Sequence, residues 1–134
     1  MSIAIDTNIL VKLLVDDDPE KGSSALTLIQ VAYENAYPVF VPLSVVLESE
    51  WVLRSRYGCT KAEVLAMLRA LLGTKELRIQ TPPVLEEAIR LYTDRVDADF
   101  ADCMHAATAA QNGCALASLD HAAAALPGAA LLTK

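Results

Sequence analysis

Short apolar runs alternate along this chain with longer stretches in which apolar residues recur every three or four positions. Short runs are typical of β-strands, and the longer periodic stretches are typical of amphipathic helices. The runs that predict strands are Ser2–Ile5, Pro38–Val41, Leu77–Ile79, Ala115–Ser118 and, as a last edge strand, Ala129–Leu132.

The stretches between these runs carry start and stop signals for helices. Pro19 suits the first position of a helix that runs to Asn35, and Ser44 is expected to cap a helix that Gly58 ends. The other predicted helices are Asn8–Val15, Thr60–Leu72 with a capping box at Thr60–Glu63, Pro83–Thr93, Asp99–Asn112 and His121–Ala125. Alternating strands and helices predict an α/β fold with a parallel sheet covered on both faces.

The length and composition predict one domain over residues 1–134, with an apolar surplus. The chain has 134 residues, of which 54% are hydrophobic. The surplus fills a tight core or leaves an apolar patch for a partner. No apolar run reaches the length of a membrane span, and no export signal precedes the first strand, so we expect a cytoplasmic protein without membrane contact. Its three cysteines are expected to be reduced thiols.

The formal net charge of −6 argues against a protein that coats nucleic acid, because such proteins are basic. It does not exclude a nuclease. Acids that hold a cation contribute to the negative count, and the site becomes locally cationic once the metal binds.

Four carboxylates follow apolar elements. Asp6 follows the first strand, Glu48 lies in the helix after the second, Asp102 begins a late helix, and Asp120 follows the fourth strand. Ligands of open α/β sheets bind beyond the carboxyl ends of the strands. Oxygen ligands without Cys or His favour Mg²⁺ or Mn²⁺, so the pattern predicts a site for a hard divalent cation.

Each acid also has a purely structural interpretation. Asp6 could begin a turn, Asp99 and Asp120 could cap helices, and Glu48 could favour the positive end of its helix. Two observations favour a site. The helix around Asp102 is apolar nearly all round, and no Lys or Arg between Val96 and Thr133 could pair with that acid. Acids gathered at one end of a sheet would also repel one another without a cation.

Three nearby features are open or have a simpler interpretation. Glu48 and Glu50 point about 200° apart on a helix, so only one can face the site, and geometry alone does not choose. His105 is better interpreted as a core histidine than as a base. Asp16–Asp18 is interpreted as a solvated loop.

Four motifs taken in order resemble the PIN-domain family, and most closely the VapC group of type II toxin–antitoxin ribonucleases. The motifs are Ile5-Asp-Thr-Asn8, Leu47-Glu-Ser-Glu-Trp-Val-Leu-Arg54, Asp99-Phe-Ala-Asp-Cys-Met-His-Ala-Ala-Thr-Ala109 and Ser118-Leu-Asp120. The resemblance implies a three-layer α/β/α sandwich with a central parallel sheet of four to five strands.

The resemblance also assigns roles to residues. The three main acids of the family pattern fall on Asp6, Glu48 and Asp102. The pattern thereby favours Glu48 over Glu50. A fourth and weaker acid falls on Asp120, but the following His121-Ala-Ala-Ala departs from the family pattern, which often has a basic or polar residue and an aromatic there. The accessory positions are Asp99, Thr7 and Asn8.

The activity that the resemblance implies is Mg²⁺- or Mn²⁺-dependent cleavage of RNA. Asp6 and Asp102 would hold the cation, and Glu48 would orient a water for in-line attack on the phosphate, with Asp120 in support. On positional grounds, the cations expected to hold the substrate are Lys12, Arg54 and Arg56. The resemblance also implies a homodimer whose helices an antitoxin wraps.

The apolar surplus supports the expectation of a homodimer and of an antitoxin partner. Several apolar residues of two helices cannot all point into one core. They are Leu26, Ile29, Val64, Leu65, Met67, Leu68, Leu71 and Leu72.

Two alternatives belong to other classes. A receiver-like signalling domain also has acids at strand ends, but it needs an acidic pair after strand one and a late lysine. Asp6 stands alone there, and no lysine lies between Lys75 and Lys134. A catalytically silent scaffold that acts only through a protein partner would keep the same motifs.

Overall fold

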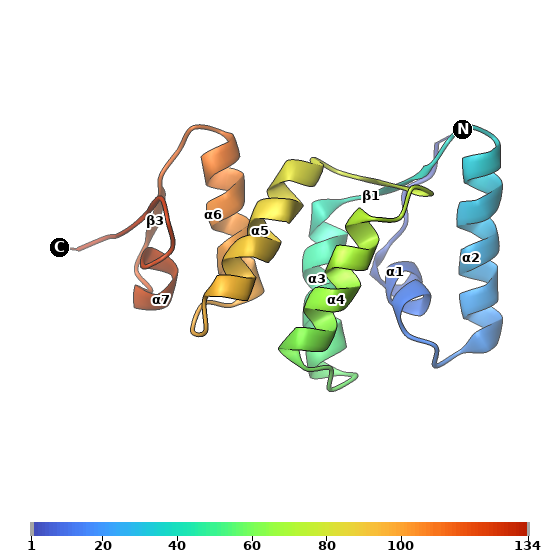
Figure 1. Cartoon of the computed structure of the whole chain (residues 1–134), viewed down its shortest axis with the longest axis horizontal. Helices are drawn as coiled ribbons and strands as arrows, with labels where there is room; N and C mark the ends of the chain where they lie inside the picture. The colour runs from blue at the N-terminus through green and yellow to red at the C-terminus, as the bar shows by residue number, and fades with distance from the viewer. Residues whose placement is uncertain (1, 134) are drawn as a thin grey trace. The chain divides into compact units, whose positions relative to one another are not determined.

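The computed structural model describes residues 2–133 of the chain, drawn in Figure 1. The chain divides into two compact units, residues 1–80 and residues 81–134. No helix among the described residues is long and apolar enough to cross a membrane.

The first unit has four helices and one pair of strands in its described part. The elements are α1 Thr7–Leu14, α2 Pro19–Glu34, β1 Val39–Val41, α3 Leu43–Ser55, α4 Lys61–Leu72 and β2 Leu77–Ile79. β1 pairs in parallel with β2, with Val39 opposite Leu77. The segment predicted as the first strand forms only a parallel bridge from Ala4 to Phe40, after which the chain enters α1.

Apolar faces of the helices enclose the strand pair of this unit. α1 packs against both α2 and α3, and its Leu10 and Val11 are buried. Val46 and Leu53 of α3 are fully buried. This packing fixes the start of α1, and with it Asp6, against the middle of α3.

The start of α3 differs from the prediction. Ser44 is not its cap, because the helix begins at Leu43 after Pro42, which makes no side-chain cap. The side-chain oxygen of Gln80, which follows β2, accepts instead from the backbone N–H of Leu43 at 2.9 Å. The helix terminus needs an acceptor for its first N–H groups, and a residue distant in sequence supplies one.

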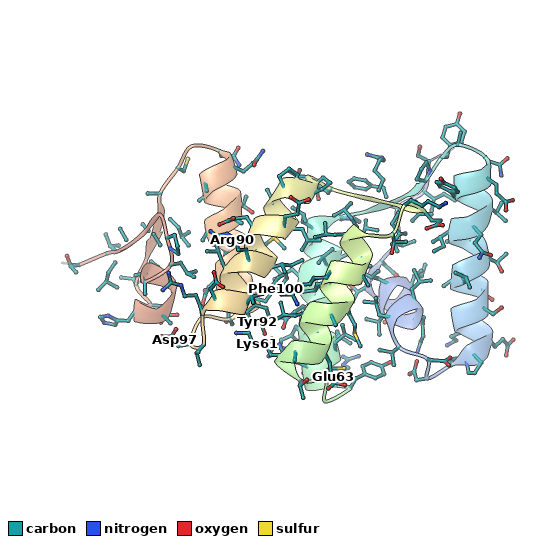
Figure 2. All side chains as sticks on the ribbon, in the orientation of Figure 1. Lys61, Glu63, Arg90, Tyr92, Asp97 and Phe100 are labelled. Atoms are coloured by element: carbon teal, nitrogen blue, oxygen red, sulfur yellow. The ribbon has the colours of Figure 1, made fainter. Side chains whose placement is uncertain are left out.

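The second unit contains three helices and a second strand pair among its described residues. The elements are α5 Pro82–Asp94, α6 Phe100–Gln111, β3 Leu116–Ser118, α7 His121–Ala124 and β4 Ala129–Leu131. α5 packs on α6, and the Tyr92 and Phe100 rings labelled in Figure 2 lie 5.4 Å apart between centroids. β3 pairs in parallel with β4, with Leu116 opposite Ala129.

The α/β class and the parallel pairing are confirmed, but one sheet of four to five strands is not shown. Within residues 2–133, each of the four strands pairs with one other strand, giving two sheets of two strands. Each strand has only three residues, and so offers few ladder hydrogen bonds. Helix packing therefore contributes most of the buried surface.

The apolar surface is distributed differently from the prediction. On α4 the residues proposed for a partner are largely buried within the chain, among them Val64, Leu65 and Leu68. Of the six large hydrophobic side chains exposed in the described part of the first unit, three lie on α2: Leu26 at 47%, Val31 at 50% and Tyr33 at 39% exposed.

Candidate active site

Asp6 lies at the start of α1, where it is the N-cap. Its Oδ1 accepts from the backbone N–H of Ile9 at 3.1 Å. Asp6 therefore has a structural role as the cap of α1. The side chain is also exposed, and the cap uses one of its two oxygens, so a carboxylate oxygen is available to a ligand.

Glu48 is brought to the same end of α1 by Thr7. The hydroxyl of Thr7 donates to Oε1 of Glu48, 41 residues away in sequence. Glu48 is exposed on α3, whereas Thr7 is half-buried. Thr7 thus adjoins two carboxylates from separate parts of the chain, Asp6 as its neighbour in sequence and Glu48 through the hydrogen bond.

Glu50 has a different environment. It is 2% exposed and forms an ion pair with the guanidinium of Arg54, whose Nη2 lies 3.1 Å from Oε1. A carboxylate buried in this way needs such a partner. The structure therefore turns Glu48 toward solvent and Glu50 into the interior, which geometry on the sequence alone left open. Arg54, one of the expected substrate cations, binds Glu50.

The second unit brings together three acids at the start of α6. Asp99 caps α6, because its Oδ1 accepts from the backbone N–H of Asp102 at 2.8 Å. Burial raises the pKa of the Asp102 carboxyl, and the negative charges of Asp99 and then Asp120 raise it further. Asp120 is itself the cap of α7.

The repulsion that Asp102 experiences fits a divalent cation. A positive charge nearby would offset the negative charges around Asp102, and oxygen donors are the ligands that Mg²⁺ and Mn²⁺ prefer. Asp6 and Glu48 supply the same donor type in the first unit. Among residues 2–133, however, no three His, Cys, Asp or Glu side chains form a group with metal-binding geometry.

His105 is not a core residue. It is exposed on α6, while Phe100, Cys103 and Met104 of the same helix are buried. The prediction of a core histidine is therefore wrong. Small alanines, which are apolar but need no burial, made the helix look buried on every side.

Two of the three expected substrate cations lie around one pocket of the first unit. The pocket has a volume of about 610 Å³, and both Lys12 and Arg56 line it together with Asn8. Lys12 Nζ lies 3.1 Å from both carboxylate oxygens of Asp17. Asp17 belongs to the predicted solvated loop, but it is not merely solvated.

Tyr57 joins the Lys12–Asp17 pair. Its hydroxyl donates to Oδ2 of Asp17 at 2.9 Å. The hydrogen bonds from Tyr57 and then Lys12 lower the pKa of Asp17, and the hydrogen bond to Asp17 raises the pKa of Lys12. The sequence analysis missed both partners. The only local signal was an acid five residues after Lys12, since Tyr57 is 40 residues from Asp17.

Comparison with known proteins decides the family. The model of the PIN domain matches residues 3–129, nearly the whole chain and parts of both units. The chain belongs to the PIN domain family. This PIN domain is 24% identical over 109 residues to the "VapC ribonuclease" of Aquifex aeolicus (strain VF5), an alignment that covers 81% of this chain and 79% of that protein. Because the chain is a PIN domain, the alternative of a receiver-like signalling domain is rejected.

Proposed function

We propose that this PIN domain is a Mg²⁺- or Mn²⁺-dependent endoribonuclease and the toxin of a type II toxin–antitoxin pair. The observation that carries the proposal is the pairing of Glu48 with Thr7 directly after Asp6. A carboxylate exposed beside a second one, and held by a hydroxyl, is arranged for a cation and a water and is not needed for the core. The similarity to a VapC ribonuclease names the activity class.

Asp6 and Asp102 are the proposed ligands of the cation. When bound, a divalent cation supplies positive charge to the phosphate under attack and makes a nearby water more acidic. Glu48, held by Thr7, orients that water in line with the leaving oxygen. Asp99 holds the N-terminus of α6, and with it Asp102, while Asp120 adds negative charge that favours the cation.

The remaining parts of the proposal concern fold and surroundings. Residues 1–134 act as a single domain, with the central parallel sheet of four to five strands that the resemblance implies. The protein works in the cytoplasm on RNA. Its antitoxin brings a basic side chain toward the acids, as a chain with net charge −6 and exposed carboxylates attracts one.

Removal of the metal tests the activity. Protein stripped with EDTA should leave single-stranded RNA intact, and added Mg²⁺ or Mn²⁺ should restore cleavage, because without a cation no water is made more acidic for the attack. Attack by water leaves 5′-phosphate and 3′-hydroxyl ends, which a 5′-phosphate-dependent exonuclease detects. Undiminished cleavage in EDTA, or products that end in 2′,3′-cyclic phosphate, would rule out the proposed chemistry.

The homodimer is tested by light scattering. We expect a mass of about 29 kDa at micromolar concentration, twice the 14.4 kDa of the chain. The exposed apolar face of α2 is the proposed contact, so Leu26→Glu should give monomers. Thr27→Glu adds the same charge at an exposed neighbouring position and should leave the dimer intact. A wild-type monomer at all concentrations up to about 100 μM would disprove the dimer. It would not bear on the proposal that the acids bind a cation.

A further inference from the structure

The pocket of about 610 Å³ in the first unit combines three cations with an apolar wall. The cations are Lys12 of α1, Lys21 of α2 and Arg56 at the end of α3. Within residues 2–133, no carboxylate lies within 4.0 Å of the charged groups of Lys21 or Arg56. In a chain of net charge −6, three cations at one pocket, two of them without an acid partner among the described residues, favour an anion.

The rest of the lining is suited to a nucleobase. Ile9, Ala25 and Leu28 form the apolar part, and the ring of Tyr57 lies beside them. Asn8 and Ser24 add hydrogen-bonding groups. A pocket of this size takes one small ligand with an apolar body and a charged end. An unstacked base with its phosphate has this character, whereas bases inside a duplex cannot enter.

Asp17 does not line this pocket, but its carboxylate binds two residues that do, Lys12 and Tyr57. Its carboxylate receives Lys12 Nζ at 3.1 Å and the Tyr57 hydroxyl at 2.9 Å. The contact is at the surface, with the Asp17 side chain 37% exposed. Surface ion pairs are weak because water and salt screen them, so a phosphate that also contacts Lys21 and Arg56 can displace the carboxylate.

The pocket is also close to the acids. Asn8 and Lys12 are four residues apart and share one face of α1. Asp6 caps the same helix, and a residue six positions on lies about 9 Å further along the axis. A nucleotide in the pocket is thus a near neighbour of a phosphate at Asp6.

We propose that this pocket seats one nucleotide of single-stranded RNA beside the cleavage point, with its phosphate on the three cations in place of Asp17. The inference rests on the proposed function for the position of the cut, but its binding step does not require cleavage. Asp17 acts as an internal competitor that holds Lys12 and Tyr57 until RNA arrives.

The test measures binding in EDTA, by fluorescence anisotropy, of a labelled single-stranded RNA of about ten nucleotides. Lys21→Gln and Arg56→Gln should each weaken binding about two- to fivefold. Each should also lower the slope of log affinity against log salt by about 0.7. Lys75→Gln is the matched control, since Lys75 is exposed, lies over the ring of Tyr33 and does not line the pocket.

A second pair of variants tests the competitor. Asp17→Asn should tighten binding about two- to fivefold more than Asp16→Asn, which removes the same charge from the same loop. Asp16 is exposed, whereas Lys12 and Tyr57 both bind Asp17. Equal effects of the two variants would show that only net charge matters and would overturn the competitor role.

Three outcomes would overturn the nucleotide pocket: cation variants that act no more than Lys75→Gln, duplex RNA that binds as tightly as the single strand, or polyglutamate that competes as well as RNA at equal charge. The last would indicate an acidic protein segment instead. Cleavage in Mg²⁺ is measured separately. Normal cleavage with unaffected binding in the pocket variants refutes this inference alone, whereas pocket-dependent binding without any wild-type cleavage refutes the proposed function alone.

Discussion

Asp6→Asn and Asp102→Asn should each lower metal-dependent RNA cleavage at least about a hundredfold, since loss even of a group that only orients a metal ligand costs 10- to 100-fold. Each change removes a charged oxygen ligand and keeps the shape of the side chain. Gel assays at saturating Mg²⁺, compared at equal concentrations of folded protein, give the rates.

The same two variants should keep their fold. An amide at residue 6 still offers an oxygen to the N–H of Ile9, so the cap of α1 persists. The raised pKa of Asp102 fixes the direction in which this residue changes the stability of the fold with pH. Folding takes up protons there, so its contribution is favourable at low pH and is lost as pH rises through the folded pKa. Above that pH, Asp102→Asn without metal should melt at the wild-type temperature or slightly higher. Wild-type cleavage by either variant would remove that residue from the site.

Glu48→Gln should also abolish cleavage, whereas Glu50→Gln should retain it per folded molecule. Glu48 is exposed and held by Thr7, so its loss removes the group that orients the water. Glu50 is buried and forms an ion pair with Arg54, and the amide removes the negative charge of that pair. We expect Glu50→Gln to lose about 1–3 kcal/mol of stability in urea unfolding.

The two glutamates are each other's control. Both changes remove one negative charge from α3, two residues apart, so a general effect of charge would act on both alike. An inactive but stable Glu50→Gln together with an active Glu48→Gln would show that the wrong glutamate has been assigned to the site.

The starts of helices were predicted most accurately from the sequence, because they depend on neighbouring residues. Pro19 begins α2 as expected, and the capping box of Thr60 and Glu63 opens α4. Asp99 caps α6. In each case the hydrogen bonds join residues within about one turn, so the residue types alone specify the geometry.

The features that the sequence did not predict depend on contacts between distant residues. Gln80 caps α3 from 37 positions away, and Tyr57 binds Asp17 from 40. Helix geometry likewise left the choice between Glu48 and Glu50 open, and only the resemblance to PIN domains favoured Glu48 before the contact with Thr7 was known. His105 was misplaced because a run of alanines has apolar composition without large side chains to bury. The composition of a helix does not tell which of its faces is buried, since burial depends on the elements that pack against it.

Binding of Mn²⁺ tests the central claim most directly, because it reports on the acids without requiring RNA. The signal of free Mn²⁺ in electron paramagnetic resonance should fall on titration with wild-type protein. It should fall far less with Asp6→Asn and with Asp102→Asn, and normally with Asp16→Asn. Wild-type binding of Mn²⁺ by both site variants would contradict a cation held by Asp6 and Asp102.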